Sequence, residues 1–242
     1  MSSMASLHSS NEKTTAPGTK VSAVCISRNS ETWNVSEIPF YNYTEGWEPF
    51  QHEQTTDRVR YLAGRRNAAV SGALVRFPET RHVLMIDSYY LHQEEQIRGL
   101  IRDYADMTIS NHPGGCILGA STWFYDLRRV RPTYRFYDGW TTPEGNPLKL
   151  AKVERSGGVI RVKSIGSCYV FPRWVWEKYG YGVLEDLHGC EHNWLCEHSG
   201  LPVYMSLDRR LSRGPIRYPW VKRIRVSLHL GRFIGRRGST TK

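Results

Sequence analysis

Short apolar runs between longer polar or amphipathic segments set the pattern along this chain, and the most informative run is HVLMIDSYY, His82 to Tyr90. Four apolar residues lead directly to Asp87, which predicts a strand buried on both faces that ends at a carboxylate. Ligands of an open α/β sheet bind outside the carboxyl ends of its strands. Asp87 is therefore expected in a nucleotide, phosphate or metal site, which indicates an enzyme.

The other periodicities predict alternating strands and helices, with a helix-rich C-terminal half. Strands are expected before Ser27, near Val35–Phe40, at Thr108–Ser110, at Cys116–Ala120, in alternation over Val159–Phe171, and at Leu201–Ser206. Helices are expected from Asp57 to about Phe77 after a Thr56 cap, at Gln93–Tyr104, for two turns after Pro172, and from an Asp186 cap to Gly200. Arg128–Lys149, rich in proline, glycine and aromatic residues, is expected to be a functional loop. The fold class is α/β, a mixed sheet with helices on both faces.

The helix after Thr56 carries an arginine on its apolar stripe. Arg66 follows Leu62 by one turn and precedes Val70 by one turn, and Asn67 sits at the edge of the same face. An unpaired interior charge is costly, so Arg66 needs an anionic partner. A bound phosphate is one candidate, and Asp87 or another acid is the other.

Composition changes this picture little. The chain has 242 residues, of which 40% are hydrophobic and 12% aromatic, enough for a sizeable core. No run approaches a membrane span, and the start does not read as a secretory signal. Five cysteines, with Cys25 and Cys168 in strand-like runs, predict buried free thiols and a reducing, cytoplasmic compartment.

We expect a disordered tail over 1–20, one domain over 21–213 and a basic extension over 214–242.

The net charge of +10 belongs to the C-terminal end. Eleven Lys and Arg residues and no acid lie between Arg209 and Lys242, which leaves 22 basic and 23 acidic residues in the remainder of the chain. Such a segment suits anionic lipid, nucleic acid or another polyanion, or is a solvated arm that aids solubility. Leucine, phenylalanine and isoleucine lie among the cations, which favours peripheral contact with an anionic membrane.

Five segments, in this order, resemble a GT-A glycosyltransferase of the nucleotide-sugar-dependent, family 2-like type. The resemblance spans roughly Val21 to Arg213, and its segments are VSAVCISRN, RRNAAVSGAL, HVLMIDSYY, SIGSCYVFPRWVWEKYGY and EHNWLCEHSGLPVYMS. It implies transfer of a sugar, often a hexose, from a nucleotide diphosphate sugar to a hydroxyl of a glycan, lipid-linked or protein acceptor. It further implies that the donor is bound by Ser27, Arg28, Asn29, Arg66, Asn67, Asp87, Ser88 and Tyr89.

Two positions depart from the family pattern. Tyr89 replaces the second Asp of the Asp-x-Asp motif, which leaves Asp87 as the one expected ligand for a divalent Mn or Mg ion. Asp87 could instead bond the ribose. The family's His after the last strand is also missing, and Arg209, Arg210 or Arg213 could supply positive charge there.

The expected catalytic base is a carboxylate near the last helix. Glu191 is favoured because Cys196 follows it at the family's spacing, whereas the adjacent Glu185 and Asp186 match the literal acidic pair. Two other interpretations stay open. A zinc site could use His188, Cys190, His192, Cys196 and His198. Alternatively, the chain could bind nucleic acid or another polyanion through its basic end, with Tyr218 and Trp220 stacking on bases.

Overall fold

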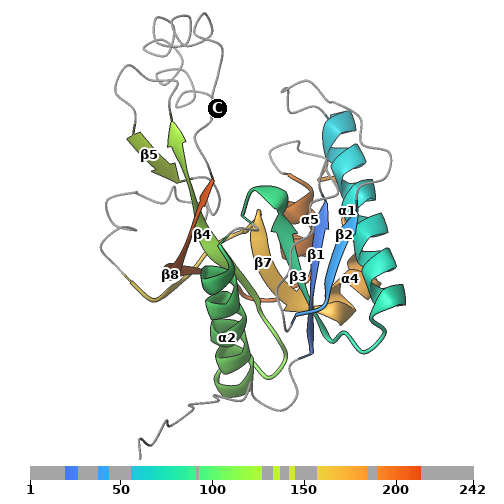
Figure 1. Ribbon diagram of the computed structural model, residues 1–242, viewed down its shortest axis with the longest axis horizontal. Coiled ribbons are helices and arrows are strands. Elements are labelled where there is room, and N and C mark those ends of the chain that lie inside the picture. The colour runs from blue at the N-terminus through green and yellow to red at the C-terminus, as the bar shows by residue number, and fades with distance from the viewer. Residues whose placement is uncertain are drawn as a thin grey trace, which may run out of the picture.

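The computed structural model describes residues 20–26, 38–43, 56–90, 93–126, 133–136, 142–144, 157–184 and 190–213. Its strands are β1 (Val21–Ile26), β2 (Phe40–Tyr43), β3 (His82–Asp87), β4 (Ile117–Asp126), β5 (Thr133–Phe136), β6 (Val159–Arg161), β7 (Cys168–Pro172) and β8 (Val203–Arg213). Its helices are α1 (Thr56–Arg76), α2 (Glu94–Ser110), α4 (Arg173–Tyr179) and α5 (Glu191–His198), with a 3-10 turn η1 (Ser88–Tyr90) (Figure 1).

The strands form one mixed eight-stranded sheet in the order β2-β1-β3-β7-β4-β8-β6, with β5 paired to β4. β1, β2 and β3 run parallel, and β7 lies antiparallel between β3 and β4. In register, Ile26 lies beside Asp87, and Ile86 lies beside Cys168. The carboxyl ends of β1 and β3 therefore meet the amino end of β7 at one edge of the sheet.

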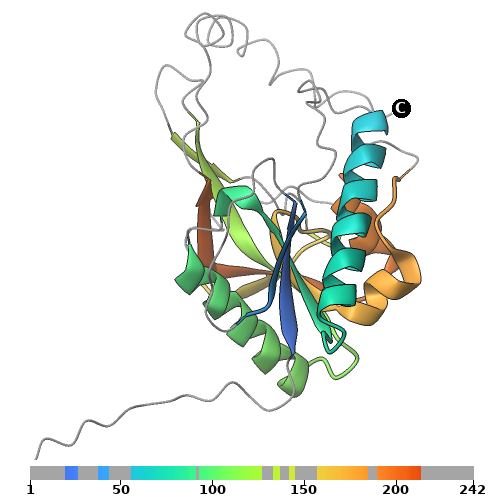
Figure 2. The same cartoon turned by 45° about the vertical axis from the view of Figure 1, so that its right-hand side comes forward.

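Helices cover both faces of the sheet because successive strand residues point in opposite directions. In β3, Val83 and Met85 join a core with residues of α1, α4 and α5, whereas Leu84 and Ile86 join a second core with residues of α2. Figure 2 shows α1 with α4 and α5 on one side of the sheet and α2 on the other. The expected α/β sheet with helices on both faces is confirmed.

Several predicted boundaries are wrong. The strand expected near Val35–Phe40 starts at Phe40 instead of ending there, and Thr133–Phe136 forms a strand within the expected loop. The strands predicted at Cys116–Ala120 and Leu201–Ser206 continue to Asp126 and Arg213, so the described part of the C-terminal half has more strand than the expected helix-rich pattern.

The predicted strand at Thr108–Ser110 belongs instead to α2. The Thr108 hydroxyl lies 3.0 Å from the carbonyl oxygens of Tyr104 and Ala105 and donates within the helix, which satisfies a polar side chain there. The last helix also differs, since Cys190 and not Asp186 is its N-cap. Within the described ranges, no helix combines the length and hydropathy needed to cross a membrane.

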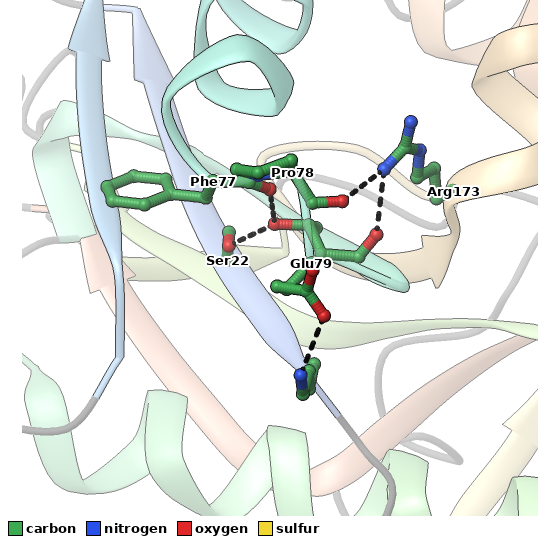
Figure 3. Close-up of polar contacts among 7 residues, drawn as sticks. Ser22, Phe77, Pro78, Glu79 and Arg173 are labelled. Carbon is green, nitrogen blue, oxygen red and sulfur yellow. Dashed lines mark hydrogen bonds and ion pairs between the residues drawn. The ribbon is translucent and has the colours of Figure 1, made fainter.

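A polar cluster fixes the turn between α1 and β3 (Figure 3). Arg173 Nη1 donates to the carbonyl oxygens of Pro78 and Thr80, at 2.7 and 3.3 Å. The Thr80 hydroxyl donates to the Phe77 carbonyl at 2.7 Å and meets the Ser22 hydroxyl at 2.5 Å. These bonds set where β3 starts, and six residues of strand then carry the chain to Asp87.

The side chain of Gln93 pairs with the backbone at the end of β8 through two hydrogen bonds. Its Nε2 donates to the Ser212 carbonyl at 2.8 Å, and its Oε1 accepts from the Ser212 amide at 2.8 Å. The backbone amide of Gln93 donates to Tyr90, the last residue of η1. The end of β8 is thus bound to the segment that follows Asp87.

Candidate functional site

An arginine bridges two carboxylates where α1, β3 and α5 meet. Arg66 Nη2 donates to Asp87 Oδ1 at 3.0 Å, and Arg66 Nε donates to Glu191 Oε1 at 2.7 Å. Arg66 lies on the buried face of α1, Asp87 ends β3, and Glu191 begins α5. Of the two partners that the sequence left open for Arg66, the acid alternative is therefore present.

The network of Asp87, Arg66 and Glu191 is unusual because two of its three charged side chains are buried. The side chains of Arg66 and Glu191 are 5% and 3% exposed, whereas that of Asp87 is 22% exposed and faces the sheet edge. The third guanidinium nitrogen, Nη1 of Arg66, is buried and has no hydrogen-bond partner among the residues that the structure describes. Buried donors are rarely left unsatisfied, so this nitrogen marks a place for an acceptor from a ligand or water.

The charges of the network stabilise one another. Burial by itself raises the pKa of Glu191, but the attraction of Arg66, with a smaller contribution from His192, lowers it overall. Burial lowers the pKa of Arg66, and Glu191 and Asp87 more than offset this, so that the pKa stays well above its ordinary value. Arg66 and Glu191 are both charged at neutral pH, and a carboxylate with a lowered pKa is a weaker proton acceptor.

A strained turn lies against the network. Ser167, which precedes β7, has a φ of 60°, and its carbonyl accepts from the Asp87 amide at 2.7 Å. The ring of His192 packs on the neighbouring Gly166, where a methyl carbon would lie 2.6 Å from His192 Cε1. Strain of this kind is held in place by surrounding structure and clusters at functional sites. The turn links Asp87 to His192.

Two tyrosines close the buried side of the site. The hydroxyls of Tyr169 and Tyr181 meet at 2.7 Å, and the Arg66 guanidinium lies 6.0 Å from the ring centre of Tyr181. Burial raises the pKa of both tyrosines, so they remain neutral. Asn67, expected at the nucleotide, instead bonds the backbone of Tyr181 through Oδ1 and Nδ2 and accepts from Trp176 Nε1.

Three consecutive residues at the start of α5 could hold a metal ion. Cys190, Glu191 and His192 each offer one ligand atom, and these atoms all lie within 4.8 Å of one another. The expected Mn or Mg site at Asp87 has weaker support, because hard cations prefer several oxygen ligands and one Asp87 oxygen already accepts from Arg66.

Several predicted site residues lie outside what the structure describes. They are Ser27, Arg28, Asn29, Glu185, Asp186 and His188, the side chains of Cys25, Tyr89 and Arg213, and the basic extension with Tyr218 and Trp220. Ser88 opens η1 directly after Asp87. Arg209, expected to supply charge at the ligand, forms a two-bond ion pair with Asp103 of α2, at 2.8 Å for each bond.

The five-residue zinc cluster is not brought together in the described part. The Cys196 thiol donates to the Ile165 carbonyl, and His198 Nδ1 contacts the Trp194 carbonyl while its ring stacks on that indole. Sequence reasoning missed Tyr181, Gly166 and the pairing of Arg66 with Glu191. A buried arginine signalled that a partner was needed, but 125 residues separate this pair.

No model of a protein family matches the chain. No curated protein is found to be similar to it.

Proposed function

We propose that this chain is a GT-A-like glycosyltransferase that moves a sugar from a nucleotide diphosphate sugar to a hydroxyl acceptor. The observation that carries the proposal is the Asp87–Arg66–Glu191 network at the carboxyl ends of β1 and β3, with one buried guanidinium nitrogen unsatisfied. Ligands of α/β sheets bind at this edge. The resemblance of the five sequence segments to GT-A glycosyltransferases supports the same proposal.

In this proposal Arg66 contacts the donor diphosphate. A guanidinium presents its donors in a planar fork that suits phosphate oxygens, and Nη1 still needs an acceptor. Asp87, partly exposed beside it, bonds the ribose or a donor hydroxyl. Ser27, Arg28, Asn29, Ser88 and Tyr89 complete the donor site, and Asn67 supports it by fixing Tyr181.

Glu191 stays our first choice for the catalytic base, with Asp186 and Glu185 as the alternatives. Its ion pair with Arg66 weakens it as a proton acceptor, so the assignment requires a direct test. The amide variant of the true base should lose turnover by about a hundredfold or more, with nucleotide affinity nearly intact. If none of Glu191→Gln, Asp186→Asn and Glu185→Gln slows transfer, no carboxylate base acts at these positions.

The decisive experiment is calorimetric titration of the purified chain with UDP, GDP and CMP and with their sugars, with and without manganese. Asp87→Asn should weaken binding of the best nucleotide by roughly tenfold or more, since a hydrogen bond to a charged group contributes about 1.5–3 kcal/mol. The matched control is Asp57→Asn, an exposed carboxylate on α1 that should leave affinity unchanged.

Absence of nucleotide binding, or equal affinity in a folded Asp87→Asn variant, would contradict the proposal. The same samples should be tested with single-stranded nucleic acid. Tight, salt-sensitive binding that requires residues 214–242, together with no nucleotide binding, would favour a polyanion-binding protein.

A further inference from the structure

We propose that Cys190, Glu191 and His192 form a binding site for a divalent ion of the zinc class, at the amino end of α5. One sulfur, one carboxylate oxygen and one ring nitrogen lie within 4.8 Å of one another. Tetrahedral zinc places its ligand atoms roughly 3.5 Å apart, as follows from bond lengths of about 2.0–2.3 Å. Small side-chain rotations would therefore bring the three atoms onto one ion.

The donor types select the ion. Thiolate and imidazole suit zinc, cobalt and similar borderline ions, whereas magnesium and calcium prefer sites made of oxygen alone. Three protein ligands also leave a fourth position of a tetrahedral ion open. The site therefore differs in ligand set and in ion class from the Mn or Mg site expected at Asp87.

Neighbouring groups already orient two of the three ligands. Arg66 Nε holds Glu191 Oε1 at 2.7 Å, which fixes the position of the carboxylate at the start of α5. The His192 ring is confined by its close packing on Gly166. Metal ligands are commonly fixed by such hydrogen bonds and packing. Cys190 is half-buried, so an ion has a route from solvent.

The balance of charge favours a cation here. Asp87 and Glu191 contribute two negative charges, and Arg66 contributes one positive charge. A thiolate at Cys190 would bring the four groups to a net charge of −2, which one divalent ion neutralises. Burial makes an uncompensated charge costly, so the ion would stabilise the arrangement.

The unsatisfied nitrogen of Arg66 indicates which kind of ligand would occupy the fourth coordination position of the ion. Arg66 Nη1 needs an acceptor, and it belongs to the same guanidinium that holds Glu191. An anionic oxygen bound to the ion would lie near this donor. Phosphate is the simplest ligand of that chemistry, and it should bind more tightly to the metal-loaded protein than to the metal-free protein.

The test uses the full chain without an affinity tag, freed of metal by a chelator and titrated with cobalt(II). We expect one equivalent to bind, with a thiolate-to-cobalt charge-transfer band and the intense visible bands of a tetrahedral ion. Cys190→Ser should lose the charge-transfer band. His192→Gln should weaken binding by at least about tenfold. His198→Gln, at the other end of α5, should leave binding unchanged.

A second measurement needs no variant. Zinc should slow alkylation of Cys190 in the wild-type protein, as followed by mass spectrometry of the peptide, and magnesium should not. The proposal is overturned if no band appears, if the band persists in folded Cys190→Ser, or if zinc leaves the alkylation rate of Cys190 unchanged. No nucleotide is present in either experiment, so a negative result would not bear on the proposed transferase activity. A positive result would make Glu191 a metal ligand and leave Asp186 and Glu185 as the candidate bases.

Discussion

At the scale of single residues, Arg66 is a buried cation that joins α1 to both β3 and α5. It is 5% exposed, and it pairs with acids that lie 21 and 125 residues away along the chain. Its position on an apolar stripe predicted a buried arginine and the need for an anionic partner. The second partner could not be predicted, because the sequence holds no local signal for a contact between α1 and α5.

Replacing this arginine should destabilise the protein. In Arg66→Met, the buried carboxylate of Glu191 and the partly exposed carboxylate of Asp87 lose their shared cation. We expect a loss of roughly 3–5 kcal/mol in the free energy of unfolding near pH 7, measured by urea titration. Arg60→Met, which breaks an exposed pair with Asp57, should cost about 0–1 kcal/mol at most.

The loss should depend on pH with a defined sign. Wild-type Glu191 has a lowered pKa, so its stabilising contribution is present at neutral pH and disappears in acid. In Arg66→Met the same carboxyl is buried without its cation and takes up a proton more readily. The stability difference between wild type and variant should therefore shrink between about pH 7 and pH 5. A difference that is constant over this range would contradict the ion-pair account.

At the scale of elements, Asn67 joins α1 to the segment that follows α4. Its side chain makes three hydrogen bonds, two to the backbone of Tyr181 and one to the indole of Trp176. The sequence placed Asn67 correctly at the edge of the buried face of α1. It did not reveal that the amide would be used for packing, because Tyr181 lies 114 residues away.

Asn67→Ala should therefore loosen the docking of this segment on α1. Each net hydrogen bond contributes about 0.5–1.5 kcal/mol, so we expect a loss of about 2 kcal/mol or more in the free energy of unfolding. Tryptophan fluorescence should also report the change, since the partner of Trp176 is removed. Asn111→Ala, at the exposed end of α2, is the matched control and should change stability little.

Two glycines offer a contrasting pair. In Gly119→Ala, near the start of β4, the new methyl carbon would lie 2.1 Å from Ile165 Cγ1, and overpacking of this kind costs about 1–3 kcal/mol. In Gly64→Ala, on α1, the new methyl carbon would meet no atom within 4 Å apart from its chain neighbours and the backbone of its own helix, and the change should stabilise the helix by about 0.5–1 kcal/mol. Thermal melting of both variants tests whether the melting temperature falls in Gly119→Ala and rises in Gly64→Ala. Equal effects would show that packing at β4 is looser than described.

At the scale of the whole molecule, the sequence predicted the fold class but not the order of the sheet. Apolar runs indicated β1, β3 and β7 because each is buried on both faces. The insertion of β7 between β3 and β4 depends on long-range pairing, which local periodicity does not encode. The length of β8 was missed for a similar reason, since its polar second half is paired with β4 and held by Gln93.

The two cores predict a loss of stability in alkali. Burial raises the pKa of Tyr104, Tyr169 and Tyr181, and it raises the pKa of Cys116 to about 11 and of Cys196 to about 12. Each of these groups has a higher pKa in the folded state than in the unfolded state. Its contribution to stability is complete while the pH is below the unfolded-state pKa, and it is lost as the pH rises above that value. Each should lower the free energy of unfolding by up to about 1.4 kcal/mol per pH unit.

Urea titrations at several pH values between about 8 and 10.5 measure this slope. Tyr169→Phe removes one of the buried hydroxyls and should flatten the slope above about pH 10. An unchanged slope would assign the alkaline loss to other groups.

The bond between Gln93 and Ser212 has a further consequence for the chain that follows. It holds the end of β8 beside the segment after Asp87, so the backbone of Arg213, the last residue that the structure describes, lies near the proposed ligand edge. A tethered segment experiences its neighbour at a high effective concentration, set by the length of the tether. An acceptor molecule bound to the basic extension would thus be presented to the site at a raised local concentration. Even weak binding to the extension would then increase how often the acceptor occupies the site.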